Sequence, residues 1–227
     1  MFPIGDDNVR GSRPSFVNYI LIVINVIVFL YQATLTPDAA QGFVNRWGVI
    51  PVNILSGNDL ITLLTSMFMH GGWLHLIGNM LFLWVFGDNI EAVLGHFGYL
   101  LFYLAGGLAA SAAHIMFNPE SIVPSVGASG AISAVLGAYI VLFPGSRIRT
   151  VVLTFGLFVT YVSAMVFLGI WFITQLFSGV ASIGVQTAQT GGVAFWAHIG
   201  GFVFGLLAGF LMKGRVTRLL GGRQRAY

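Results

Sequence analysis

The sequence predicts an all-α membrane protein, a bundle of six membrane-spanning helices in which the fourth helix is short. The first observation is composition: of 227 residues, 57% are hydrophobic and only 7% are charged, and the mean hydropathy is +0.89. Soluble domains carry about 25% charged residues, so composition excludes an ordinary soluble fold. The second observation is six apolar runs that approach the ~20 residues a helix needs to cross a bilayer. The third is that basic residues gather on one side of these runs.

The predicted spans, in chain order, cover residues 16–35, 73–86, 97–117, 129–143, 164–177 and 193–212. The fourth span is short, since 15 residues of helix extend only about 22 Å at 1.5 Å per residue. The hydrocarbon core is about 30 Å thick, so we expect this helix to begin below the membrane surface. A re-entrant loop at 124–128 would then precede it in a hydrated cavity. In the long connection 36–72, the apolar stretch 60–68 suits a segment at the membrane interface.

Charge placement predicts the orientation in the membrane. Nine of the ten basic residues lie on the side of the termini, and Arg46 lies on the other side. Because positive charge stays inside, both termini are expected in the cytoplasm. We expect a multi-pass protein of the cell membrane, and the family resemblance described below implies a bacterial plasma membrane. The predicted parts are a cytoplasmic tail at 1–15, a membrane domain at 16–213 and a basic cytoplasmic tail at 214–227. The first span lacks a small-residue cleavage site, so we expect it to remain.

Ser129 and His198 are the candidate reactive residues, because each lies in a predicted span. A hydroxyl or imidazole buried in hydrocarbon without a partner costs about 2–7 kcal/mol. The fourth span carries a small residue at every fourth position from Ser129, and the sixth carries glycines at 201, 205 and 209. Stripes of small residues let membrane helices approach closely. If the two stripes pack together, His198, three positions before Gly201, points at Ser129.

His75 and Asn79 are candidate donors to an oxyanion, since they lie four positions apart and share one helix face. Together with the Ser129 amide they would stabilise negative charge on a carbonyl oxygen. One such donor is worth about 2.7–4 kcal/mol in a water-soluble protease. The chain has no cysteine, so the nucleophile would be a hydroxyl, and no carboxylate in these spans is placed to orient His198. The residues predict a dyad, with Ser129 as nucleophile and His198 as general base and then acid.

The motifs, taken in order, resemble the rhomboid family of intramembrane serine proteases. They lie at 67–80, 86–91, 127–130, 197–201 and Gly205. The resemblance covers nearly all of the chain from residue 47 to residue 209. It implies the six-helix core of bacterial rhomboids and an intramembrane serine endopeptidase that cleaves membrane-anchored proteins in or near their membrane helix. In that family pattern Ser129 and His198 would be the catalytic dyad, and His75 and Asn79 the oxyanion-stabilising pair.

The same resemblance implies further roles. His70 and Glu91 would be structural, and Trp171 and Phe172 in the fifth span would form the substrate gate, capped by an outer loop at 178–192.

Two positions depart from the family pattern. Many members carry a Trp-Arg pair in the first outer loop, where this chain has Ile61 and Thr62. Some members place an aromatic residue four positions after the serine, to stack on the histidine, where this chain has Ser133. We therefore expect His198 to be held by packing or by another hydrogen bond.

Other interpretations remain open at this point. Taken alone, Ser129 is an ordinary helix N-cap and His198 a packing residue. A zinc site would use His70, His75 and His198, but the chain has no His-Glu-x-x-His pair. An aspartyl protease needs two acids at mid-membrane, and a transporter would show broken helices in matching halves. The main alternative is a catalytically silent rhomboid-like protein that binds and escorts client helices.

We expect membrane-anchored protein substrates and the lipid bilayer as partners, and no nucleic acid, cofactor or metal. The sequence leaves the oligomeric state open.

Overall fold

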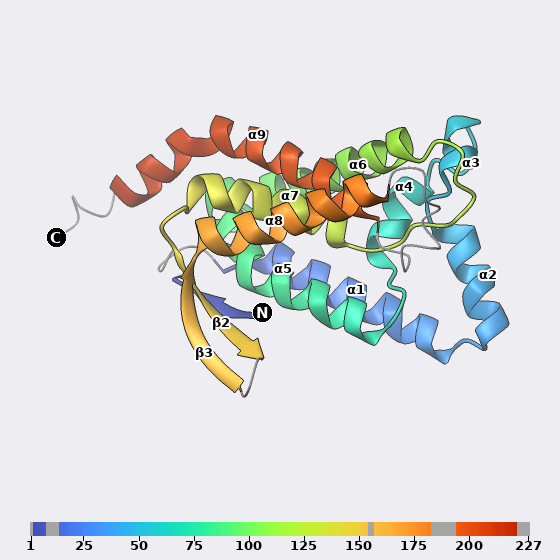
Figure 1. The fold of residues 1–227 in the computed structure, drawn as a ribbon, viewed down its shortest axis with the longest axis horizontal. Coiled ribbons are helices and arrows are strands. Elements are labelled where there is room, and N and C mark those ends of the chain that lie inside the picture. Colours follow the sequence, from blue (N-terminus) through green and yellow to red (C-terminus); the bar gives the residue numbers. More distant parts are fainter. Residues whose placement is uncertain (1, 8–13, 154–156, 183–193, 222–227) are drawn as a thin grey trace.

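A computed structural model describes residues 2–7, 14–153, 157–182 and 194–221. Helices dominate this part of the chain, as the sequence predicts (Figure 1). Five of them are long and apolar enough to cross a membrane. These helices are α1 (Phe16–Thr34), α5 (Trp73–Leu94), α6 (His96–Phe117), α8 (Ala164–Ala181) and α9 (Phe195–Gly221). A sixth apolar helix, α7 (Ser129–Leu142), is shorter, with 14 residues.

Helix α7 is the centre of the bundle. Every residue of α7 after Ser129 is buried, and the helix packs against α9, α6, α5 and α8. Its 14 residues extend about 21 Å, which is less than the thickness of a hydrocarbon core. Because neighbouring helices enclose it, α7 does not need to reach both membrane surfaces.

The contact between α7 and α9 depends on glycines. A Cβ atom added to Gly201 would lie 2.1 Å from the carbonyl oxygen of Gly130, and one added to Gly205 would lie 2.0 Å from that of Ala134. A Cβ atom on Gly137 would lie 2.1 Å from the carbonyl oxygen of Phe202. No side chain fits at such distances, so the two backbones touch directly, and the predicted packing of the small-residue stripes is confirmed.

Short helices lie at one end of the bundle (Figure 1). They are α2 (Pro37–Trp47), α3 (Pro51–Leu55), α4 (Thr62–Thr65) and the 3-10 turn η1 (Ser66–Phe68). They hold the segment before α7 through backbone hydrogen bonds. Val49 and Ser125 form an antiparallel bridge, and the N–H of Gly127 donates to the carbonyl of Ser66 at 2.9 Å. The loop that leads into Ser129 is therefore fixed by the first long connection.

A three-stranded antiparallel sheet, which the sequence analysis did not predict, lies at the other end of the bundle (Figure 1). Its strands are β1 (Phe2–Asp6), β2 (Arg147–Leu153) and β3 (Leu157–Ser163), in the order β1-β2-β3. The apolar stretch after α7 alternates Val, Thr and aromatic residues, which favours strands. The N-terminal strand completes the sheet, with Phe2 opposite Val151.

A buried polar network ties α1 to α5 and α6. The Glu91 carboxylate accepts hydrogen bonds from the backbone N–H groups of Val17 at 3.0 Å and Asn18 at 2.8 Å. The Asn18 amide donates to the Leu83 carbonyl and accepts from the Tyr99 hydroxyl. Glu91 thus satisfies two free N–H groups at the first turn of α1, which is favourable for an anion there.

Several predicted boundaries were wrong. Helix α5 continues eight residues past the predicted end at Phe86, to Leu94, because the carboxylate of Glu91 is satisfied by hydrogen bonds from the start of α1. Helix α8 continues to Ala181, so residues 178–181 of the predicted outer loop are helical, and residues 183–192 of that loop lie outside the described residues. Helix α9 runs to Gly221, past the predicted end of the last span at 212.

Candidate active site

Ser129 and His198 are in direct contact. The hydroxyl oxygen of Ser129 lies 2.8 Å from Nε2 of His198, within hydrogen-bond distance. Ser129 is the first residue of α7, and His198 lies in the first turn of α9. Both side chains are partly buried. The two residues are 69 positions apart in the chain, so the packing of α7 on α9 brings them together.

The second ring nitrogen of His198 also has a partner. Nδ1 lies 2.8 Å from Oε1 of Gln175, which is on α8. The indole ring of Trp171, one turn earlier on α8, lies against the imidazole with ring centroids 5.9 Å apart. Gln175 was not among the residues predicted from the sequence; the available signal was an amide side chain inside an otherwise apolar helix.

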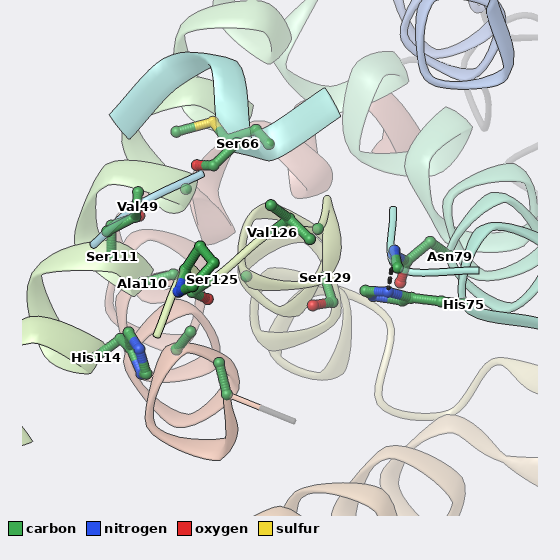
Figure 2. Close-up of a pocket in the computed structure, with 18 of the residues that line it drawn as sticks. Val49, Ser66, His75, Asn79, Ala110, Ser111, His114, Ser125, Val126 and Ser129 are labelled. Atoms are coloured by element: carbon green, nitrogen blue, oxygen red, sulfur yellow. Dashed lines mark hydrogen bonds between the residues drawn. The ribbon is translucent and has the colours of Figure 1, made fainter. Parts of the chain in front are cut away.

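Ser129 and His198 line a cavity of about 1060 Å³. Figure 2 shows Ser129 in the middle of this lining, with His75 and Asn79 of α5 on one side. The opposite wall comes from α6 and the loop before α7; its labelled residues include Ala110, Ser111, His114 and Ser125. The cavity therefore brings the predicted nucleophile, base and anion donors to one space.

His75 is placed to donate a hydrogen bond into the cavity. The backbone N–H of Gly71 donates to Nδ1 of His75 at 3.3 Å, so Nδ1 is the acceptor and the neutral ring carries its proton on Nε2. Figure 2 shows the ring extending from α5 toward Ser129. A Cβ atom on Gly127, which has φ of +140°, would lie 2.9 Å from that Nε2. Glycine is needed at 127 both for its backbone conformation and for the close approach of His75.

Asn79 is held by His70. The Asn79 amide nitrogen lies 2.9 Å from Nε2 of His70, and both side chains are buried. Burial lowers the pKa of His70 to about 3, with a smaller contribution from the nearby His75, so His70 is neutral and accepts through Nε2. The amide group has two N–H donors, and the bond to His70 uses one of them. Gln32 of α1 brackets the backbone of His70 with two hydrogen bonds and fixes its position.

At the two positions that depart from the family pattern, other contacts take the place of the family's residues. The hydroxyl of Ser133 donates to the carbonyl of Ser129 at 2.6 Å, and the aromatic contact to His198 comes from Trp171 instead. Ile61 is exposed, whereas Thr62 is buried and its hydroxyl donates to the Asp59 carbonyl at 2.7 Å. The loop is thus held by local hydrogen bonds where many members carry a Trp-Arg pair.

The predicted gate residues lie on the face of α8 that meets α9. The ring of Phe172 stacks on that of Phe202 at 4.4 Å between centroids, and the ring of Trp171 lies 5.9 Å from the same phenyl group. The opposite face of α8 exposes large apolar side chains, including Val166, Ile170 and Ile173. The described residues bring together no group of three His, Asp or Glu side chains able to hold a metal ion.

Fold and site define a class: a multi-pass helical membrane protein with a hydrogen-bonded serine and histidine inside a cavity. The comparison with protein families agrees with this class, because residues 57–215 match the Rhomboid domain. The chain belongs to the rhomboid family, and the resemblance noted from its motifs is confirmed.

Individual relatives are similar over long stretches. The chain is 30% identical to Rhomboid protease GluP of Bacillus subtilis over 138 residues, covering 61% of this chain and 26% of the relative. It is 28% identical to Rhomboid protein 1, mitochondrial, of Saccharomyces cerevisiae over 212 residues, covering 91% of this chain and 56% of the relative. It is 30% identical to RHOMBOID-like protein 6, mitochondrial, of Arabidopsis thaliana over 159 residues, covering 70% of this chain and 46% of the relative. The matched stretches thus span from 26% to 56% of the length of these relatives.

Proposed function

We propose that this protein is an intramembrane serine endopeptidase that cleaves membrane-anchored proteins in or near their membrane helix. The observation that carries the proposal is the 2.8 Å contact between the Ser129 hydroxyl and His198 Nε2, inside a cavity lined by His75 and Asn79. Membership of the rhomboid family and the similarity to a Bacillus subtilis protein named a rhomboid protease support it.

In the proposed acylation step, Ser129 Oγ attacks the scissile carbonyl carbon while its proton passes to His198 Nε2. The tetrahedral intermediate collapses when the C–N bond breaks and the protonated His198 gives its proton to the leaving amine. Water then attacks the acyl carbon while His198 takes one of its protons. The bond between the acyl carbon and Ser129 Oγ breaks, and His198 returns that proton to Ser129 Oγ. The carboxylic acid product loses its remaining proton to solvent and leaves as a carboxylate, and both side chains regain their initial protonation states.

The proposed oxyanion site consists of His75 Nε2–H, the Asn79 amide and the backbone N–H of Ser129. The charge state of these groups suits the task, because neutral donors in a partly enclosed site bind an anion without carrying a buried charge of their own. The N-terminus of α7 adds a partial positive charge at the same place. Gly127 permits His75 to approach this point, since a larger side chain would meet its ring.

The substrate in this proposal is an extended peptide segment rather than an intact helix. A helix hydrogen-bonds its own carbonyls, so the segment must unwind locally before Ser129 reaches a carbonyl carbon. Glycine, proline and small side chains near the scissile bond should therefore favour cleavage. We propose that the substrate enters beside α8, with Trp171 and Phe172 as gate residues, because α8 is attached to α9 by ring contacts and exposes its opposite face.

We also propose that both termini lie in the cytoplasm and that the cavity opens toward the outer side of a bacterial plasma membrane. The location of nine of the ten basic residues on the side of the termini supports this orientation. The proposed parts remain a tail at 1–15, a membrane domain at 16–213 and a basic tail at 214–227. Because the chain contains no cysteine, single cysteines placed at Gln41 and Gly145 can be labelled with a membrane-impermeant maleimide in intact cells. Labelling at 145 but not at 41 would contradict the orientation.

The test of the proposed function is cleavage of a single-span model substrate by purified protein in detergent and in liposomes. Wild type should cut the substrate at a site that mass spectrometry can locate, and Ser129→Ala and His198→Ala should not. Ser56→Ala, which alters an exposed serine in α3's C-terminal cap, serves as the matched control and should retain activity. Full activity in either dyad variant would refute the mechanism. Binding of the substrate without cleavage by wild type would favour the silent client-binding protein instead.

A further inference from the structure

Both ring nitrogens of His198 are engaged, each by a different helix. Nε2 faces Ser129 of α7 at 2.8 Å, and Nδ1 faces Oε1 of Gln175 of α8, also at 2.8 Å. A histidine that takes a proton from a serine must present an unprotonated Nε2. In a neutral imidazole this requires the proton on Nδ1, and that proton needs an acceptor when the ring is half-buried.

We infer that Gln175 is a positioning residue for the dyad: its side-chain oxygen accepts the Nδ1–H of His198 and so selects the tautomer that receives the Ser129 proton. This inference rests on the proposed function. In the reverse arrangement the Gln175 amide would donate to Nδ1, the proton would sit on Nε2, and His198 would donate to Ser129 rather than accept from it. The two arrangements make opposite predictions for a carboxylate at 175, because a carboxylate accepts and does not donate.

The chemistry explains why an amide suits this position. During the reaction His198 becomes an imidazolium, and the Gln175 oxygen dipole stabilises its Nδ1–H. An aspartate or glutamate would stabilise the imidazolium more strongly, but it would also place a permanent charge at a membrane-embedded helix, which is costly. A neutral acceptor orients the base without that cost.

The placement on α8 makes the orientation of the base depend on how α8 packs. Gln175 and Trp171 are four residues apart on one face of α8, and both contact the His198 ring. Two aromatic contacts to Phe202 and a close approach at Gly179, where a Cβ atom would lie 2.8 Å from Ile199, hold this face against α9. The imidazole is thus fixed on three sides, by Ser129, Trp171 and Gln175.

The experiment compares Gln175→Met, which keeps the side-chain length and removes the acceptor, with Gln175→Glu, which keeps an acceptor. The matched control is Thr174→Val, the neighbouring position, whose hydroxyl donates to the carbonyl of Trp171 in its own helix. Each purified variant is assayed for kcat and KM on the model substrate, for the pH dependence of kcat, and for the rate at which a fluorophosphonate labels Ser129. Labelling reports the reactivity of the serine independently of substrate entry.

We expect Gln175→Met to lower kcat and the labelling rate about tenfold with KM unchanged, since one hydrogen bond to the reacting base is lost. Gln175→Glu should keep activity, with the acidic limb of its pH profile moved to higher pH because the carboxylate stabilises the imidazolium. Thr174→Val should match wild type. If Gln175→Met does not fold, the pH profile of Gln175→Glu decides alone.

Wild-type kcat and labelling in a folded Gln175→Met variant would overturn the inference. So would a folded Gln175→Glu variant that is as slow as Gln175→Met, or one whose pH profile does not move. These results leave the proposed function intact as long as wild type cleaves the substrate and Ser129→Ala does not. Absence of cleavage by wild type, in contrast, would refute the proposed function itself.

Discussion

The substitution Gly201→Ala, which adds a single methyl group to α9, tests how the packing of α7 on α9 positions the site. In Gly201→Ala the new Cβ atom would lie 2.1 Å from the carbonyl oxygen of Gly130, and 3.2 Å from Cβ of Ser133. The obstructing atom is backbone, so no side chain can rotate away. Gly201 lies three residues after His198, and Gly130 follows Ser129 directly, so the clash falls beside the dyad.

The size of the effect follows from these distances. A carbon and a carbonyl oxygen come no closer than about 3.3 Å in ordinary contacts, so α7 and α9 must separate by about 1 Å. Added to the 2.8 Å between Ser129 and His198, such a separation takes the pair beyond hydrogen-bond reach, which ends near ~3.2 Å. A misplacement of about 1 Å costs about a hundredfold in rate. Overpacking of this kind also lowers the free energy of unfolding by about 1–3 kcal/mol.

The assay measures kcat in detergent together with thermal unfolding, for a graded series of glycine-to-alanine variants. Gly209→Ala is milder, because its Cβ atom would lie 3.0 Å from Val141 and 3.1 Å from Ala138. Gly169→Ala on α8 is the control, because its Cβ atom would meet nothing within 4 Å. We expect the loss of activity to follow the order Gly201, Gly209, Gly169, with no loss at 169. Wild-type kcat and stability in Gly201→Ala would refute the inferred α7–α9 contact.

Two further predictions concern the oxyanion donors and pH. Asn79→Ala should lower kcat about a hundredfold with little change in KM, because its amide acts on the transition state; a raised KM with normal kcat in steady-state assays would instead indicate a structural role. Burial raises the pKa of Asp6 from 3.8 to about 6, against the lowering effect of hydrogen bonds from Tyr139 and Asn89. The folded protein therefore binds this proton more tightly than the unfolded chain, so stability falls as pH rises from 3.8 to about 6. Asp6→Asn should flatten that part of the curve of thermal unfolding against pH, and an equally steep fall in the variant would contradict the assignment.

The sequence predicts the helical bundle and the meeting of Ser129 with His198 because both depend on local spacing. Glycines at every fourth position mark the face of α9 that meets α7, and the place of His198 on that face follows from helix geometry. The rhomboid-like motifs also predict that His75 lies near Ser129, and both residues line the same cavity. These features need only helix periodicity and the expectation that small residues mark close contacts.

Other features depend on non-local contacts and are not predicted. Gln175 belongs to no motif, and its relation to His198 follows only from the packing of α8 on α9. The sheet requires a strand at the start of the chain to pair with residues more than 140 positions later. In addition, an apolar run in a membrane protein is more readily interpreted as a helix than as a strand. Helix α5 extends past its predicted end because the carboxylate of Glu91 finds N–H donors on α1.

The most direct test of the central claim is to map the covalent adduct that a fluorophosphonate forms with the purified protein. The Ser129–His198 dyad predicts that Ser129 Oγ displaces fluoride, so that mass spectrometry finds a single modified residue at 129. The adduct should be absent in Ser129→Ala and should form at least a hundredfold more slowly in His198→Ala, by analogy with the loss of a general base of about 10²–10⁴ in rate. An adduct at another residue, or undiminished labelling of Ser129 in His198→Ala, would contradict the dyad.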